Sequence, residues 1–189
     1  MCVDDLPCKQ SICTSRSFPP PGLDKLADLE EAVANFAASC ARKLRLQHSA
    51  AGSITVFAHT NRFRTDLPSD YIQASAHFEV ATSALTEIVA AAIDALHSQW
   101  KNYPFIYKKA GVIVWNIIPQ EMVHPSLFDH IDRAKQERLQ KAIDSVNLQC
   151  GHDTLRSATQ GYSKKWHIKS EYISQRFTTN LGEIISLKV

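Results

Sequence analysis

The fold is decided by the stretch Lys108-Lys109-Ala110-Gly111-Val112-Ile113-Val114, in which a basic doublet leads into an apolar, β-branched run. Such a run is typical of a buried strand. Two ammonium groups at the start of a rigid strand are well placed to contact the phosphate backbone of a nucleic acid. Lysines at a sheet edge have another use, because their charge discourages pairing with a second sheet. Both interpretations of the doublet stay open until the rest of the chain is considered.

The bulk composition describes an ordinary globular protein. The chain has 189 residues, 44% of them hydrophobic, and a formal net charge of +2. This length suits one domain of usual size, alone or with a smaller one, and the apolar fraction can fill a core. The charge says little about partners, although basic residues slightly outnumber acidic ones after residue 125.

No feature of the sequence points to a membrane or to an oxidising compartment. No apolar run approaches the ~18–20 residues that cross a bilayer. The N-terminus carries Asp4 and Asp5 where a signal peptide would be basic, so we expect a cytoplasmic protein. The five cysteines are odd in number and contain no CxxC pair, which predicts reduced thiols rather than disulfides or a structural zinc site.

Apolar periodicity and turn residues predict six elements before Pro119. Strands and helices follow in the order β-α-β-β-α-β, over residues 9–18, 24–47, 53–60, 73–80, 84–101 and 107–118. Ala51-Gly52 is expected to end the first helix, and Thr82 or Ser83 to cap the second. This order predicts an α+β fold, with two helices on one face of a four-stranded antiparallel sheet.

One face of this sheet is expected to stay open. Residues 73–80 alternate strictly, with Ala74, Ala76, Phe78 and Val80 on one side and polar side chains on the other, as in a sheet covered on one face only. After Pro119 we expect a linker over 120–130 and a third helix over 131–149 that ends at Gly151. Its apolar side would consist of Ile131, Leu139, Ala142, Ile143 and Val146.

Short motifs then occur in the order and spacing of one protein family. They are Cys13-Thr14-Ser15-Arg16-Ser17-Phe18, Ala34-Asn35-Phe36-Ala37-Ala38, Lys43-Leu44-Arg45, Phe57-Ala58-His59-Thr60-Asn61-Arg62-Phe63 and Tyr107-Lys108-Lys109-Ala110-Gly111-Val112. Further along come Thr154-Leu155, Ala158-Thr159-Gln160-Gly161, Trp166 and Ser174-Gln175-Arg176-Phe177-Thr178-Thr179. From residue 9 to about 180, the chain resembles the C-terminal part of a UmuC-like Y-family translesion DNA polymerase, the catalytic subunit of DNA polymerase V.

The resemblance implies a domain layout and a function. It implies a little-finger DNA-binding domain over 9–119, a linker with a degenerate clamp-binding peptide over 120–130, and a small, mainly helical tail domain over 131–189. Family polymerases carry their metal-binding carboxylates in a palm domain before the little finger, and only residues 1–8 precede that region here. We therefore expect the chain to be no enzyme on its own and to hold no cofactor, with Mg²⁺ expected only in the absent palm.

The resemblance also implies contacts with the backbone of primer–template DNA. Hydroxyl, amide and cationic side chains can bind phosphate oxygens without reading bases, as lesion bypass requires. The candidates are Ser15, Arg16, Ser17, Thr60, Asn61, Arg62, Lys108 and Lys109.

Protein partners are implied as well. The family carries a clamp-binding peptide of the form Gln-Leu-x-Leu-Phe where this chain has His124, Pro125, Leu127 and Phe128; His124 and Pro125 replace the first two residues, and Leu127 and Phe128 supply the anchors. A UmuD-type accessory subunit or a recombinase filament could dock on the tail. Trp166 is either core or a base-stacking residue among lysines, and core is favoured. The alternative function is an adaptor that binds the clamp or the accessory subunit without binding DNA.

Overall fold

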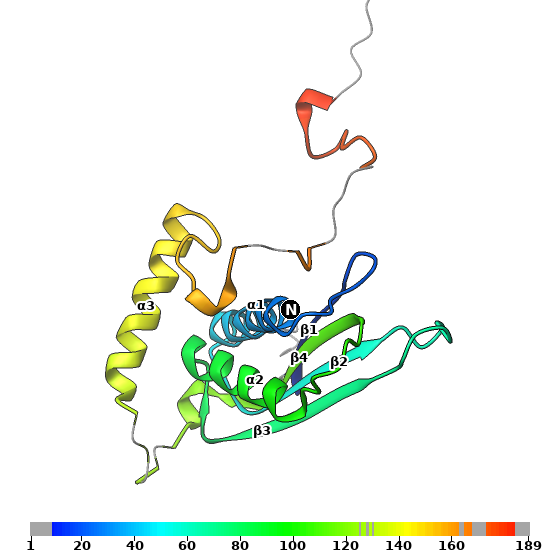
Figure 1. Cartoon of the computed structure of the whole chain (residues 1–189). Helices are drawn as coiled ribbons and strands as arrows, with labels where there is room; N and C mark the ends of the chain where they lie inside the picture. Colours follow the sequence, from blue (N-terminus) through cyan, green and yellow to red (C-terminus); the bar gives the residue numbers. More distant parts are fainter. Residues whose placement is uncertain are drawn as a thin grey trace, which may run out of the picture.

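The computed structural model describes residues 9–124, 126–127, 129, 131–162, 165–167 and 173–183. The elements are β1 (Ser11–Ser17), α1 (Leu26–Leu46), β2 (Ser49–Thr60), β3 (Tyr71–Thr82), α2 (Leu85–Gln99), β4 (Tyr107–Pro119), η1 (Gln120–Met122), α3 (Arg133–Cys150), η2 (Ala158–Gln160) and η3 (Leu181–Glu183). The predicted α+β fold with its β-α-β-β-α-β order is confirmed (Figure 1).

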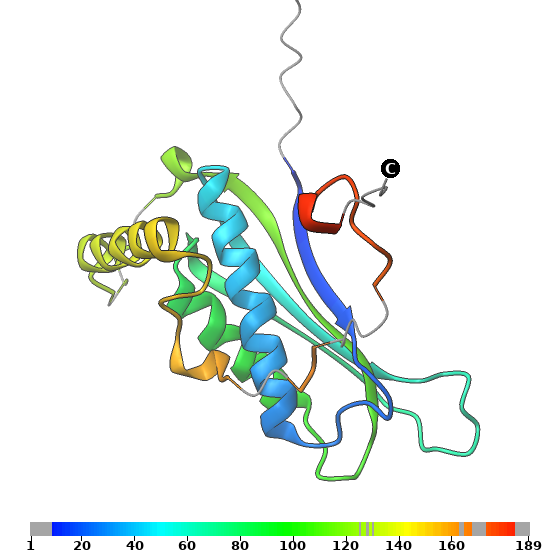
Figure 2. The same ribbon diagram turned by 90° about the horizontal axis from the view of Figure 1, so that it is seen from above.

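The four strands form one antiparallel sheet in the order β1-β4-β2-β3. β4 therefore lies inside the sheet, hydrogen-bonded to β1 on one side and to β2 on the other. The interpretation of Lys108 and Lys109 as guards of a sheet edge is wrong, because an inner strand has no free edge to protect. β1 and β3 are the edge strands, and α1 runs lengthwise across the sheet (Figure 2).

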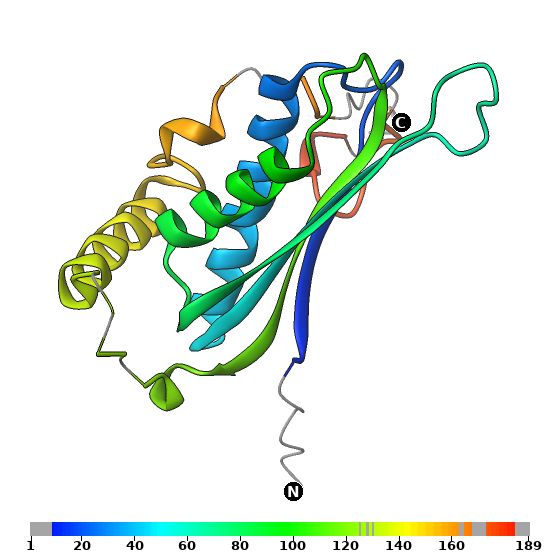
Figure 3. The same cartoon turned by 60° about the horizontal axis from the view of Figure 1, so that its bottom comes forward.

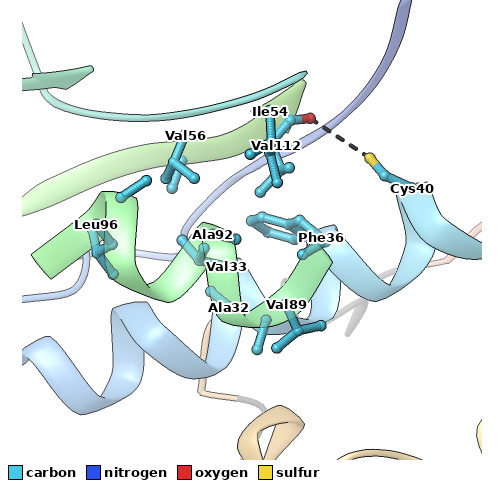
Figure 4. Close-up of a cluster of buried hydrophobic side chains, with 14 of the residues drawn as sticks. Ala32, Val33, Phe36, Cys40, Ile54, Val56, Val89, Ala92, Leu96 and Val112 are labelled. Carbon is cyan, nitrogen blue, oxygen red and sulfur yellow. Dashed lines mark hydrogen bonds between the residues drawn. The ribbon is translucent and has the colours of Figure 1, made fainter. Parts of the chain in front are cut away.

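α1 and α2 cover the same face of the sheet (Figure 3), and the hydrophobic core fills the space between these two layers. Figure 4 shows the centre of this core, where Val33 and Phe36 of α1 meet Val89 and Ala92 of α2 beneath Val56 and Val112 of the sheet. The thiol of Cys40 is buried there, 3.7 Å from the Val112 carbonyl oxygen, and burial raises its pKa. Cys13 and Cys150 are also free thiols.

Two predicted boundaries are wrong. α1 ends at Leu46, and His48 turns the chain with a left-handed φ of 51°, so β2 already begins at Ser49. Gly52 does not break a helix: it lies inside β2 where the pairing register shifts, and a Cβ there would meet the Asn116 side-chain nitrogen at 2.7 Å. A glycine in a strand often marks such a bulge.

The start of α2 is also capped differently from the prediction. Its N-cap residue is Ala84, which has no capping side chain. The Thr82 hydroxyl accepts a hydrogen bond from the Ala84 N–H at 3.1 Å, and Gln140 of α3 accepts one from the Leu85 N–H at 3.2 Å. A distant helix thus satisfies one donor at the start of α2, where the sequence predicted a cap by Thr82 or Ser83 alone.

The predicted apolar side of α3 is only partly covered. Its residues range from exposed (Ile131, Leu139, Ala142) to half-buried (Ile143, Val146), and Gln140 is the buried residue of the helix. Polar contacts also hold α3: Asp144 accepts two hydrogen bonds from Arg45, at 2.6 and 2.9 Å. Gly151 ends the helix, as predicted.

Trp166 is part of the main core. Its side chain is 5% exposed and packs at a steep angle against Phe36 of α1, with ring centroids 5.4 Å apart. Nearby, the Asn35 side chain donates to the Gln160 carbonyl at 2.6 Å, and a Cβ on Gly161 would strike Glu31. The core interpretation of Trp166 is confirmed, and both η2 and Trp166 are packed onto α1.

We expect Trp166→Ala to lower the free energy of unfolding by ~3–5 kcal/mol, because it deletes a buried indole and leaves a cavity against Phe36. Urea unfolding monitored by circular dichroism measures this loss. Leu148→Ala is the control: Leu148 is an exposed apolar residue of α3, so its variant should stay within ~0.5 kcal/mol of the parent. Equal losses for both variants would contradict this placement of Trp166.

Candidate nucleic-acid interface

The sheet face turned away from the helices carries the candidate interface. Side chains alternate along each strand, so every second residue belongs to this open face. The pairing register sorts them into four rows across β1, β4, β2 and β3: Ser11, Trp115, Ser53, His77; then Cys13, Ile113, Thr55, Ser75; then Ser15, Gly111, Phe57, Gln73; then Ser17, Lys109, His59, Tyr71. The predicted open face and the alternation of residues 73–80 are confirmed.

The third row is tightly packed around Gly111. A Cβ at this position would lie 2.5 Å from both the Phe57 Cζ and the Ser15 Cβ. The missing side chain therefore lets the Phe57 ring and Ser15 approach each other across β4. Phe57, which is only half-buried, leaves part of its ring on the open face.

The fourth row gives one end of the face its positive charge. Lys109 is half-buried between Ser17 of β1 and His59 of β2 in the register. Lys108 belongs to a different arrangement: it is the extra residue at a register shift, and its ammonium donates to the Phe18 carbonyl at 2.7 Å. Of the basic doublet, Lys109 is the lysine that the alternation assigns to the open face.

The Ser15, Arg16 and Ser17 motif is divided between the two faces. Ser15 and Ser17 belong to the open face, whereas Arg16 pairs with Ala110, which is buried on the helix side. Arg16 is exposed at the sheet edge, and its side chain makes no hydrogen bond or ion pair with another residue in the described ranges. Its guanidinium is thus available to a ligand that reaches this edge.

The second candidate trio, Thr60 to Arg62, begins the hairpin between β2 and β3, which extends beyond the end of the sheet (Figures 2 and 3). Thr60 is 4% exposed, and its hydroxyl accepts from the Asp70 N–H at 3.1 Å, so it closes the hairpin. Asn61 accepts from the Phe63 N–H at 3.1 Å and shapes the turn. Arg62 is exposed, with its guanidinium carbon 5.9 Å from the centre of the Tyr71 ring.

Asp70 anchors the base of this hairpin. Its buried carboxylate accepts a hydrogen bond from the Tyr107 hydroxyl at 2.7 Å and pairs with Lys101. Burial alone would raise the pKa of Asp70, but these two partners outweigh it and hold the pKa below its usual value. Burial and the neighbouring carboxylate raise the pKa of Tyr107, so the pair stays a neutral phenol bonded to a carboxylate. The position of Arg62 therefore rests on a buried connection to β4.

Aromatic side chains on the open face are the feature that motif comparison missed. Trp115 is 37% exposed, and its indole N–H donates to the Thr55 hydroxyl at 3.0 Å. The His77 ring meets it at 75°, with centroids 5.7 Å apart. Trp115 directly follows Val114, a core position, so period-two alternation would have assigned Trp115 to this face.

The candidate clamp-binding peptide follows η1. His124 is exposed, and the Leu127 side chain is fully exposed, at 100%. Phe128 lies outside the described residues, and so does Pro125. The one anchor that is described is thus presented to solvent rather than packed on the domain.

The described part of the chain offers no metal centre: no three His, Cys, Asp or Glu side chains within it come together as ligands. None of its helices is both long and apolar enough to span a bilayer.

The groups on the open face allow two kinds of binding: cations at one end can bind anions, and aromatic rings at the other end can stack on aromatic groups.

Comparison with known proteins identifies relatives of this chain. A model of the impB/mucB/samB family C-terminal domain matches residues 9–127, and a domain of unknown function matches residues 137–187. UmuC of Salmonella typhimurium is 33% identical over 96% of this chain and 43% of its own length. ImpB of the same organism is 34% identical over 94% and 42%, and MucB of Escherichia coli is 32% identical over 94% and 41%. The chain spans about two fifths of the length of these relatives.

We expect Gly111→Ala to lower the free energy of unfolding by ~1–3 kcal/mol, because the new methyl group collides with Phe57 and Ser15. Combining it with Phe57→Ala should cost less than the sum of the two single variants, since the ring then no longer opposes the methyl group. Urea unfolding of all four proteins measures this coupling. Strictly additive losses would mean that Gly111 and Phe57 do not share a row.

Proposed function

The chain belongs to the impB/mucB/samB family, the UmuC-like Y-family polymerases, and we propose that it serves as the part of such a polymerase that engages DNA and docks partner proteins. The work of the whole polymerase would be translesion synthesis in DNA repair and SOS mutagenesis. In this proposal the chain binds and positions primer–template DNA, whereas phosphoryl transfer belongs to the metal-binding palm domain of the family.

The observation that carries this proposal is the gathering of available cations at one end of an uncovered sheet. Lys109 lies in the fourth row, Arg62 at the hairpin next to Tyr71 of the same row, and Arg16 at the neighbouring edge. Ser17 adds an exposed hydroxyl between them. Such groups bind phosphate oxygens and carry no base specificity, which suits a template whose bases are damaged.

The geometry also refines the set of proposed contacts. Thr60 is buried and its hydroxyl is engaged, so it supports the hairpin rather than touching DNA. The Lys108 ammonium already donates to the Phe18 carbonyl, which leaves its neighbour Lys109 as the main lysine of the site. Asn61 and Ser15 remain as polar contacts beside the cations.

A triple variant, Arg16→Ala/Arg62→Ala/Lys109→Ala, should bind primer–template DNA more weakly than the parent. We expect the parent affinity to fall about tenfold to a hundredfold between ~50 and ~200 mM salt, and the variant to lose roughly one unit of the logarithmic salt slope for each phosphate contact removed. Fluorescence anisotropy of a labelled primer–template over this salt range measures both quantities.

The matched control is Arg42→Ala/Lys135→Ala/Arg138→Ala, which removes the same charge from exposed positions on α1 and α3. It should retain the parental salt slope. If both triple variants bind alike, general charge rather than the open face attracts DNA. If the parent itself binds no DNA, the adaptor function is favoured.

We also propose that the linker binds the sliding clamp through Leu127 and Phe128. Full exposure of Leu127 supports this, because an apolar side chain that packs on nothing is available to a groove on a partner. Pull-down with the purified clamp should retain the parent and lose Leu127→Ala/Phe128→Ala. Leu155→Ala, at an exposed leucine of the tail, is the control and should be retained. Equal retention of all three proteins would exclude this peptide as the contact.

A further inference from the structure

Trp115 lies where neither the fold nor phosphate binding requires an indole. It occupies the first row of the open face, on the inner strand β4, between Ser11 of β1 and Ser53 of β2. The side chain is 37% exposed, although tryptophan is among the residues with most apolar surface to bury. The core on the other side of the sheet is complete without it.

The indole ring is held in a defined orientation. Its N–H donates to the Thr55 hydroxyl at 3.0 Å, and the Thr55 hydroxyl is also 2.8 Å from that of Ser75. The ring of His77 braces it at 75°, and His77 is itself fixed by a 2.9 Å hydrogen bond with the Ser53 hydroxyl. A surface aromatic that is oriented in advance costs little conformational entropy when a ligand stacks on it.

The distance of Trp115 from Lys109 in the fourth row indicates what kind of ligand could stack on the indole. Trp115 and Lys109 are six residues apart on β4, which corresponds to about 20 Å along the strand. A nucleic-acid strand anchored at Lys109 can therefore reach the indole several nucleotides further along. Bases inside a duplex already stack on one another and show only their edges, so an aromatic ring face selects unpaired bases.

We propose that Trp115 stacks on an unpaired base, and that the open face thereby forms a binding site for single-stranded DNA. RNA-recognition domains with a four-stranded sheet use exposed aromatic side chains in this way to stack unpaired bases. Phe57, half-buried on the neighbouring inner strand, lies in the row between Trp115 and Lys109 that a bound strand would cross. The inference rests on the proposed function in that the cations of the basic end hold the backbone.

Intrinsic fluorescence can report the stacking directly. The chain has three tryptophans; Trp166 is buried and Trp100 is half-buried, which leaves Trp115 as the exposed one. Titration with a thymidine oligonucleotide of about 12 nucleotides should quench the parental fluorescence, whereas a blunt duplex of the same length should quench it much less. Trp115→Ala should abolish the quenching.

Affinity gives the second readout. By anisotropy, Trp115→Ala should lower affinity for the single strand roughly 5-fold to 100-fold and leave duplex affinity within about twofold. Trp115→Phe should recover much of the loss, because it keeps a ring to stack. Ile113→Ala is the matched control: it truncates an apolar side chain of the same strand and face without removing a ring, and should stay within about twofold.

The outcomes separate this inference from the proposed function. If the single strand binds Trp115→Ala as tightly as the parent while the Arg16/Arg62/Lys109 variant still weakens DNA binding, the stacking inference is overturned and the proposed function stands. If the parent binds primer–template DNA but not the single strand, the stacking inference alone fails. If the parent binds neither, both fail. If Ile113→Ala loses as much affinity as Trp115→Ala, the face acts as a general apolar surface, as one that binds a protein partner would. This result would also overturn stacking.

Discussion

The register of β4 is the constraint on which the rest of the structure depends. Val112 lies opposite Thr14 of β1 and Val56 of β2, so a single strand sets the alignment of both halves of the sheet. Its buried alternation, Ala110, Val112 and Val114, supplies the sheet side of the core. A slip of one residue would turn these side chains to solvent and bury Lys109 and Trp115 beneath the helices. Burial on the helix side therefore determines which groups the open face displays.

A buried hydrogen bond extends this control to the hairpin. Tyr107 begins β4 beneath the helices, and its hydroxyl donates to Asp70 at the other end of the β2–β3 loop. Thr60 closes the same loop from the β2 side through its own bonds to Asp70. Asp70 therefore connects β4 to the hairpin. Because of this connection, Arg62 and Lys109 lie at the same end of the sheet although they come from different elements.

The faces of the fold could be predicted from the sequence, because alternation is local. The pattern in residues 73–80 was sufficient to assign each side chain of that stretch of β3 to the helices or to the open face. The order of the strands was not predictable in this way, since placing β4 between β1 and β2 depends on residues far apart in the chain. The same holds for the tail: Gln140 caps α2 and Trp166 joins the core on α1 through contacts that no periodicity encodes. For the site, motif resemblance pointed to the cations, but the pairing register was needed to show that Ser15, and not Arg16, belongs to the open face.

The helix-covered face of the sheet also carries α3 and the segment around Trp166, whereas the open face is available to a ligand. α3 and the segment around Trp166 pack on α1 and α2, so they lie with the helical layer rather than on the open face (Figure 3). The contacts of α3 include polar ones, with Asp144 bonded to Arg45 and Gln140 to the start of α2. Polar contacts of this kind specify a position while burying little apolar surface, so α3 can be fixed without consuming the hydrophobic surface that stabilises the sheet. A ligand on the open face and a partner on the helical side would then be separated by the thickness of the domain, and neither would have to displace the other.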